Sequence, residues 1–241
     1  MTGLILAAGS GTRLGDEVCK PLVKIAGRHL IEYSLENLFG MGVERICIVV
    51  GKYGNEIESR IGSSYNGIPV FYVEQKSPAG LVNAIACALD IVEGDTVLQL
   101  SDEVFIGSNA SKIAKLWDNG HTDFVCGVTR EDNPAAIMGN YSVEVDNIGS
   151  LISCTEKPRV VTNSLKGTGF CIFSAECMKI LKKVYDEENN TPAELCDFMN
   201  MLINRDMRGA IAIAAAKEYN INTAQDADAA KAELEKKAVE K

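Results

Sequence analysis

The chain has 241 residues, of which 46% are hydrophobic, which is enough to bury a core without disulfides or a structural metal. It contains no run of about 18 apolar residues and no basic segment before its short apolar start, so we expect a cytoplasmic protein without membrane contact. The formal net charge is −9, from 24 Lys+Arg against 33 Asp+Glu. Because no basic stripe is visible, the sequence argues against nucleic-acid binding.

The eight cysteines form no C-x-x-C pair, and the chain has only two histidines. Most of the cysteines lie in apolar runs, as expected for free thiols that pack as small hydrophobic residues in a reducing compartment. A zinc site would need clustered Cys and His ligands. The sequence therefore predicts neither a disulfide framework nor a zinc site.

In the first half of the chain, apolar strand-like runs alternate with amphipathic helical runs, as repeated βαβ units require. We expect strands at 4–7, 45–50, 70–73 and 96–100, and helices at 30–39, 55–61 and 81–89. This alternation predicts an α/β protein with one doubly wound, mixed and mainly parallel sheet. Ligands of such sheets bind beyond the carboxyl ends of the strands. The loops after the first and fourth strands should therefore meet in one crevice.

The second half has a more mixed pattern. We expect short strands at 124–128, 141–145, 151–154, 169–173 and 210–214, and helices at 177–184 and 193–203. The charged, Ala-rich segment 223–241 predicts a C-terminal helix that is solvated or, alternatively, contacts a second copy in a homo-oligomer. Since no linker divides the chain, we expect one domain over 1–241.

A glycine-rich loop follows the first strand. It reads AAGSGTRLG over 7–15, and KPL follows at 20–22. Glycines let backbone N–H groups turn towards a phosphate. A dinucleotide-binding loop would carry its third glycine one position before Gly15, and a P-loop would end in G-K-S or G-K-T. A triphosphate held by loop amides, Arg13 and Lys20 fits better, and such cations suit a reaction that releases pyrophosphate. An ordinary glycine turn with surface cations is the alternative.

These residues resemble the signature of the sugar-1-phosphate nucleotidyltransferases, which include the glucose-1-phosphate thymidylyltransferases and uridylyltransferases. The resemblance extends over nearly the whole chain, because later motifs appear in the family's order. It implies a Rossmann-like fold of the GT-A type, with a nucleotide-binding half (1–107), an acceptor-binding half (108–222) and a C-terminal helix (223–241). It also implies that Arg13 and Lys20 bind and activate the triphosphate. The other loop residues assigned to the nucleotide are Leu6, Ala8, Gly9, Gly11 and Thr12.

The stretch QKSPAGL over 75–81 is similar to the family's Q-x-x-P-x-G-L, which reads a pyrimidine base. A glutamine amide can pair with the edge of uracil or thymine, because it donates and accepts at once. The resemblance assigns Gln75, Pro78 and Gly80 to the base, and an exposed polar side chain is the alternative for Gln75. UTP or dTTP is favoured, and CTP stays open.

Asp102 follows the strand at 96–100, and a carboxylate at a strand end is a natural Mg²⁺ ligand. The family's usual G-D-N or A-D-D reads Ser101-Asp102-Glu103 here. The resemblance assigns Asp102 to Mg²⁺ and Ser101 to the nucleotide, and leaves Glu103 in doubt. It makes Asn222 the second metal ligand, where many members carry aspartate. A helix N-cap is the alternative for Asn222.

Glu156-Lys157-Pro158 matches the family's E-K-P motif, in which the lysine holds the acceptor's phosphate. The resemblance also places Tyr141 and Gly169 at the acceptor. Hexose-specific members commonly carry Y-G-V before E-K-P, whereas Tyr141 stands near that glycine's place. This departure allows a smaller acceptor, such as phosphocholine or a phosphonate, which related short cytidylyltransferases use.

The prediction is therefore a Mg²⁺-dependent enzyme that transfers a nucleotide from a pyrimidine nucleoside triphosphate to a sugar-1-phosphate. A CTP-dependent cytidylyltransferase for phosphocholine or an alkylphosphonate is the alternative. A non-catalytic relative that binds nucleotide sugars should have lost the loop cations or the metal aspartate, and here both are present.

Overall fold

The computed structural model describes residues 1–9, 18–77, 79–117, 120–187 and 193–239. Over this part of the chain, the secondary-structure elements are β1 (Thr2–Ala7), η2 (Lys20–Leu22), β2 (Lys24–Ile25), β3 (Arg28–His29), α1 (Leu30–Met41), β4 (Arg45–Val50), α2 (Gly54–Ile61), β5 (Ser64–Tyr65), β6 (Ile68–Glu74), α3 (Leu81–Cys87), β7 (Thr96–Leu100), β8 (Glu103–Ser108), α4 (Ala110–Trp117), β9 (Phe124–Arg130), α5 (Pro134–Met138), β10 (Tyr141–Val145), β11 (Leu151–Glu156), β12 (Leu165–Phe173), α6 (Ala175–Glu187), α7 (Leu195–Ile203), β13 (Gly209–Ile213), β14 (Ala215–Asn220) and α8 (Ala224–Val239).

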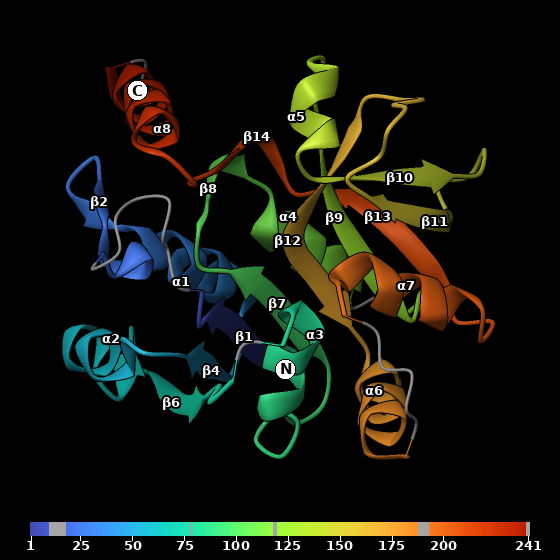
Figure 1. Cartoon of the computed structure of the whole chain (residues 1–241), viewed down its shortest axis with the longest axis horizontal. Coiled ribbons are helices and arrows are strands. Elements are labelled where there is room, and N and C mark those ends of the chain that lie inside the picture. The colour runs from blue at the N-terminus through green and yellow to red at the C-terminus, as the bar shows by residue number, and fades with distance from the viewer. Residues whose placement is uncertain (10–17, 78, 118–119, 188–192, 240–241) are drawn as a thin grey trace.

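The first half is the parallel part of a mixed sheet, with helices on both faces (Figure 1). β1 pairs in parallel with β4 and β7, and β4 pairs in parallel with β6. Because strand side chains alternate, Leu4 and Leu6 pack in a core with α3, whereas Ile5 and Ala7 pack in a second core with α1. The predicted doubly wound α/β fold is confirmed, and β4 and β7 have the predicted bounds.

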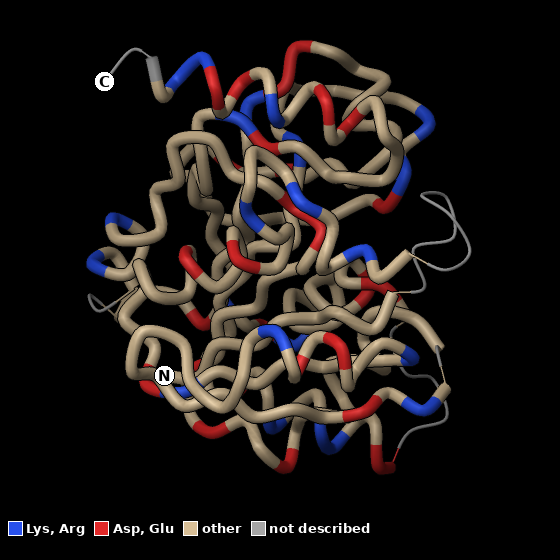
Figure 2. Tube along the Cα trace, turned by 90° about the vertical axis from the view of Figure 1, so that its left-hand side faces the viewer, with Lys and Arg blue, Asp and Glu red and all other residues tan. Residues whose placement is uncertain are grey.

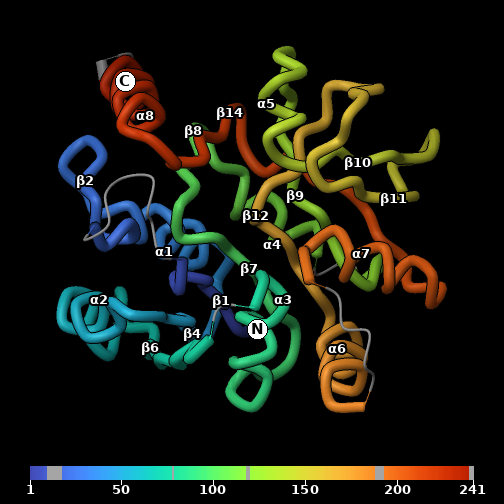
Figure 3. Tube along the Cα trace, in the orientation of Figure 1, coloured from blue at the N-terminus to red at the C-terminus, as the bar shows by residue number. Residues whose placement is uncertain are grey.

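The second half extends the same sheet with antiparallel strands. β12 pairs antiparallel with β7, β9 and β10, and β13 pairs in parallel with β9. Figure 3 traces these segments, with β12 lying beside β7 where the two halves join. β12 is thus the strand that brings the second half against the strand end that carries Asp102.

A separate two-stranded sheet, which the sequence analysis missed, is formed by β8 and β14. Its register pairs Glu103 with Asn220, and it packs with α8 in a small core. The pairing brings the segment after Asn220 against the segment before Glu103, because Ile221 N–H donates to the Asp102 carbonyl at 2.8 Å. Positions far apart in the sequence therefore meet at one end of this sheet.

One predicted helix boundary is wrong. The helix expected to begin at 193 begins at Leu195, because Glu194 caps it in a reciprocal capping box with Asp197.

All eight cysteines are free thiols, six of them buried. No described helix is long and apolar enough to cross a membrane. Lys and Arg are interspersed with Asp and Glu along the trace in Figure 2.

Candidate active site

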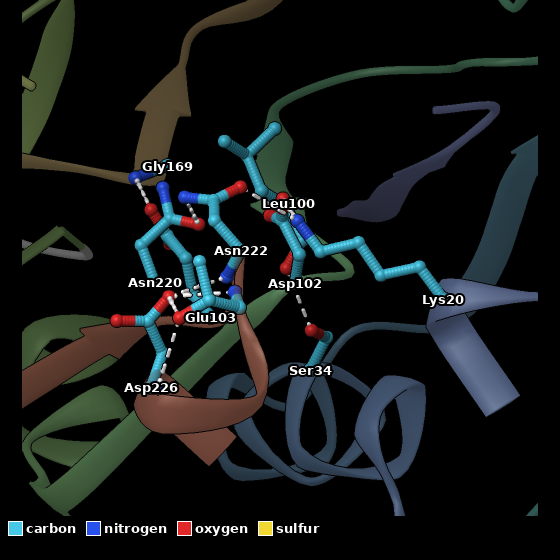
Figure 4. A network of polar contacts seen from close by, with 10 residues as sticks. Lys20, Ser34, Leu100, Asp102, Glu103, Gly169, Asn220, Asn222 and Asp226 are labelled. Carbon is cyan, nitrogen blue, oxygen red and sulfur yellow. Dashed lines mark hydrogen bonds and ion pairs between the residues drawn. The ribbon is translucent and has the colours of Figure 1, made fainter. Parts of the chain in front are cut away.

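Lys20, Asp102 and Asn222 meet at the carboxyl end of β7 (Figure 4). The Lys20 Nζ donates to Asp102 Oδ2 at 2.6 Å and to Asn222 Oδ1 at 3.0 Å. The lysine side chain is 11% exposed and the aspartate side chain 27%. A carboxylate oxygen and an amide oxygen thus converge on one cationic group.

These two oxygens fit a hard divalent cation. Mg²⁺ is usually bound by one or two protein oxygens together with water and substrate phosphates. Among the described residues, no group of three or more His, Cys, Asp or Glu could hold a metal ion. The donor set of Asp102 and Asn222 therefore suits Mg²⁺ shared with a phosphate better than a cation enclosed by the protein.

Asn222 does not use its side chain to cap α8. The Thr223 Oγ1 accepts from Asp226 N–H at 3.2 Å, and Asp226 Oδ2 accepts from Thr223 N–H at 2.7 Å and from Asn222 N–H at 2.9 Å. Thr223 and Asp226 therefore form the cap. The Asn222 amide donates to Asn220 Oδ1 at 3.0 Å, and this bond turns its oxygen towards Lys20.

Backbone bonds position Asp102. Ser101 N–H donates to the Leu6 carbonyl at 3.2 Å, which continues the pairing of β7 with β1. The Leu100 carbonyl accepts from Ser34 Oγ at 2.8 Å. Leu6 and Ser101 are both buried, so the strand end that carries Asp102 is held by its neighbours on either side.

The structure describes only the start of the glycine loop. Ala8 is half-buried and Gly9 is exposed. A Cβ at Gly51 would lie 2.8 Å from the Ala8 carbonyl oxygen, so the residue that directly follows β4 has no room for a side chain. The predicted nucleotide residues Gly11, Thr12, Arg13 and Pro78 lie outside the described residues.

Gln75 is buried, not the exposed polar residue of the alternative interpretation. Its Nε2 donates to Asn83 Oδ1 at 2.7 Å and to the Gly80 carbonyl at 3.5 Å. Gly80 has φ +93°, and a Cβ there would lie 2.8 Å from the Ala193 carbonyl oxygen. The structure thus brings Gln75 and Gly80 together, and both are fixed by contacts with their surroundings.

A pocket of about 230 Å³ lies beside this centre. It contains all the residues predicted to bind the acceptor, together with a predicted metal ligand; these are Tyr141, Glu156, Lys157, Gly169 and Asn222. The Lys157 Nζ lies 3.3 Å from Glu156 Oε1, and its side chain is 69% exposed. Lys157 therefore presents an exposed cation at the edge of the pocket, next to the candidate metal site.

Tyr141 lies in the wall of this pocket and mostly inside the core. It is 6% exposed, and its Oη donates to the Thr168 carbonyl at 2.7 Å. Burial raises the pKa of this phenol well above its usual value. A Cβ at Gly167 would come within 1.9 Å of the Tyr141 ring. The tyrosine is therefore accommodated by a glycine on the neighbouring strand.

Glu103 is the site residue to which the sequence analysis gave no role. It is 2% exposed, and its Oε1 accepts from Gly169 N–H at 2.7 Å. Its other oxygen, Oε2, is buried and has no hydrogen-bond partner among the described residues. Burial, followed by the nearby carboxyl of Glu218, raises the pKa of Glu103 well above its usual value. In the sequence, the only sign of a special role for Glu103 is that Ser101-Asp102-Glu103 differs from the usual motif.

The geometry and the sequence agree with one family of proteins. A family model for nucleotidyl transferases matches residues 2–218. The chain therefore belongs to the nucleotidyl transferase family.

Three known proteins show the range of the likeness. The chain is 28% identical over 207 residues to a UTP–glucose-1-phosphate uridylyltransferase of Haloferax volcanii, covering 84% of each chain. It is 28% identical over 179 residues to a glucose-1-phosphate thymidylyltransferase of Streptomyces antibioticus; the match covers 72% of this chain and 49% of that protein, so it extends over about half of the relative's length. A UDP-glucose pyrophosphorylase crystallised with UDP-glucose superposes with a TM-score of 0.84 at 20% identity, covering 98% of both chains, which shows the shared fold.

Proposed function

We propose that this nucleotidyltransferase uses Mg²⁺ to transfer a nucleotide from UTP or dTTP to a sugar-1-phosphate, with release of pyrophosphate. The observation that carries the proposal is the convergence of Asp102 and Asn222 on Lys20, beside the pocket that contains Lys157. The relatives named for uridylyl and thymidylyl transfer to glucose-1-phosphate support these substrates.

Asp102 and Asn222 would hold the metal. When bound there, Mg²⁺ would neutralise charge on the phosphates. Lys20 bonds to both oxygens in this structure, and its long side chain allows the ammonium to move to the triphosphate when a divalent cation takes these oxygens. In the absence of a metal, Lys20 is thus the counterion of the Asp102 carboxylate.

The transfer needs no covalent enzyme intermediate. An oxygen of the acceptor's phosphate forms a bond to the α-phosphorus, and the bond from that phosphorus to the oxygen bridging to the β-phosphate breaks. Lys20 and Arg13 would stabilise the charge on the departing pyrophosphate, and Lys157 would hold the acceptor's phosphate. A phosphate dianion is already a nucleophile, so catalysis is orientation, which can supply about 7–11 kcal/mol, together with electrostatic stabilisation.

The Tyr141 side chain does not favour the alternative with a smaller acceptor. Because its phenol bonds to the backbone of β12 and only 6% of the residue is exposed, the ring takes little space from the pocket. The acceptor half can therefore admit a sugar ring although Tyr141 stands near the place of the family's glycine.

The proposal is tested by pyrophosphate release with Mg²⁺ for UTP, dTTP, CTP, ATP and GTP, each against glucose-1-phosphate, N-acetylglucosamine-1-phosphate, phosphocholine and 2-aminoethylphosphonate. We expect release with UTP or dTTP and a hexose-1-phosphate. Release only with CTP and phosphocholine or the phosphonate would overturn the proposal in favour of a cytidylyltransferase.

A further inference from the structure

The strand β12 carries a bulge beside the acceptor pocket. In its pairing with β9, Gly167 lies opposite Val128 and Cys171 lies opposite Cys126. Residues 168–170 therefore stand opposite the single residue Gly127. A Cβ at Gly127 would lie 2.3 Å from the Phe170 carbonyl oxygen, so the bulge also requires a glycine on β9.

A bulge leaves backbone groups without partners in the ladder, and buried groups of this kind need other partners. Here side chains provide them. The Thr168 hydroxyl donates to the Gly127 carbonyl at 2.9 Å and accepts from Phe170 N–H at 3.2 Å. The Thr168 carbonyl accepts from Tyr141, and Gly169 N–H donates to Glu103, both at 2.7 Å. Two of the side chains that provide these partners, Tyr141 of β10 and Glu103 of β8, come from outside β12.

The bulge is part of the pocket wall. Thr168 and Gly169 both line the pocket, as do Glu103 and Tyr141. A Cβ at Gly169 would come within 2.2 Å of the Leu100 side chain, so the wall is pressed against the end of β7. Glu103 directly follows Asp102 in the chain, and its bond to Gly169 therefore links the acceptor wall to the candidate metal site.

We propose that Glu103 and Tyr141 are positioning residues that hold the bulge at 168–170 in shape and thereby set the affinity for the acceptor. Neither needs to touch the nucleotide. This inference rests on the proposed function. Because the bulge forms part of the wall that the acceptor would contact, a defect in either residue should appear first in the KM for the acceptor.

The test compares four variants. Glu103→Leu removes the oxygen that binds Gly169, and Tyr141→Phe removes the hydroxyl that binds Thr168. Glu103→Gln keeps an acceptor oxygen of the same reach and serves as the rescue. Tyr72→Phe is the matched control, because the Tyr72 Oη donates to the Gly62 carbonyl at 2.6 Å on the outer part of the parallel sheet.

We expect Glu103→Leu and Tyr141→Phe to raise the KM for the sugar-1-phosphate about tenfold, which corresponds to the loss of about one hydrogen bond, with the KM for the nucleoside triphosphate changed by less than about twofold. Glu103→Gln and Tyr72→Phe should stay near the wild type. Amide hydrogen exchange of residues 167–171 should become faster in the two defective variants, which provides a readout that does not depend on turnover.

The outcomes separate the two proposals. If the wild type turns over a sugar-1-phosphate but both defective variants keep its KM and the slow exchange, the positioning role is overturned and the proposed function stands. If the KM for the sugar-1-phosphate and the KM for the nucleoside triphosphate rise by the same factor in the folded variants, the specific role in acceptor affinity is overturned. A wild type that turns over no sugar-1-phosphate would overturn the proposed function itself, while the exchange measurement would still show whether Glu103 and Tyr141 hold the bulge.

Discussion

The two halves of the molecule position their candidate site residues in different ways. In the parallel half, Asp102 is placed by the regular ladder of β7 on β1 and by the bond from Ser34 of α1 to the Leu100 carbonyl. In the antiparallel half, Gly169 is placed by an irregularity in β12 and by side chains from two other strands. The first arrangement rests mainly on backbone pairing between strands. The second arrangement depends on particular side chains. Mutations should therefore affect the two halves to different extents.

The largest effect is expected at Lys20, which bonds to Asp102 and Asn222. Lys20→Ala should lower kcat by about 10³-fold without unfolding the protein, because it removes a cation that stabilises the departing pyrophosphate. Lys24→Ala is the matched control, since this lysine is exposed in the neighbouring β2. Steady-state pyrophosphate release measures kcat, and circular dichroism measures whether the variant is folded. A Lys20→Ala variant with near-normal turnover would remove Lys20 from the mechanism.

The next effect tests the buried ion pair that connects the antiparallel half to the strand leading to Asn222. The Lys166 Nζ lies 2.7 Å from Glu218 Oε2, and both side chains are at most 5% exposed. Lys166→Met should lower the free energy of unfolding by about 3–5 kcal/mol, because it leaves a buried carboxyl without its partner. Urea denaturation measures the loss.

The double variant Lys166→Met/Glu218→Leu should recover most of that stability, since it removes both buried charges. A single variant as stable as the wild type would show that the pair does not hold β12 against β14.

Much of the parallel half could be predicted from the sequence. The strands at 45–50 and 96–100 alternate with amphipathic helices, and the ends of parallel strands must meet at one edge. Asp102 could therefore be placed near the glycine loop by topology alone. The pairing of β8 with β14, which brings Asn222 to Asp102, could not be foreseen from local pattern, because it joins segments far apart in the chain.

The acceptor half was harder to predict for a physical reason. Strand propensity shows where β12 runs, but not that its ladder shifts between Gly167 and Cys171. The role of Glu103 depends on that shift, since only the bulge leaves Gly169 N–H in need of a side-chain acceptor. The sequence shows an acid directly after Asp102, but neither its burial nor its partner could be predicted.

A smaller effect is expected at Asn222, the proposed second metal ligand. Asn222→Ala should lower turnover by about 10–100-fold at limiting Mg²⁺, with partial recovery at high Mg²⁺, because one of two protein oxygens is lost. Asn222→Asp should retain activity and saturate at lower Mg²⁺. The measurement is the Mg²⁺ dependence of pyrophosphate release. Identical curves for wild type and Asn222→Ala would contradict the assignment.

The smallest effect concerns thiol chemistry. Burial raises the pKa of Cys47, in the parallel half, to about 12, so its thiolate is scarce at pH 8 and it should react slowly with thiol reagents. Cys19 and Cys87 are only half-buried and should react first. Native and denatured titrations with a chromogenic disulfide measure the difference. Rapid reaction of all eight thiols in the native protein would contradict the packing of both halves.

The pH dependence follows from the same raised pKa. A thiol whose pKa is raised by folding contributes stability that is present below the ordinary thiol pKa and is lost as the pH rises towards about 12. The free energy of unfolding of the wild type should therefore fall above about pH 9, and it should fall less in Cys47→Ala. Equal slopes for the two proteins would show that Cys47 ionises as easily in the folded state as in the unfolded state.

The central claim is that Asp102 and Asn222 share one divalent cation while Lys20 turns to the triphosphate. The most direct test is a crystal structure with Mn²⁺ and a non-hydrolysable UTP analogue, with the metal located by its anomalous signal. We predict Mn²⁺ bound by the oxygens of Asp102 and Asn222, and the Lys20 Nζ bound to a phosphate. Mn²⁺ bound elsewhere, or Lys20 still bonded to Asp102 with the nucleotide in place, would contradict the claim.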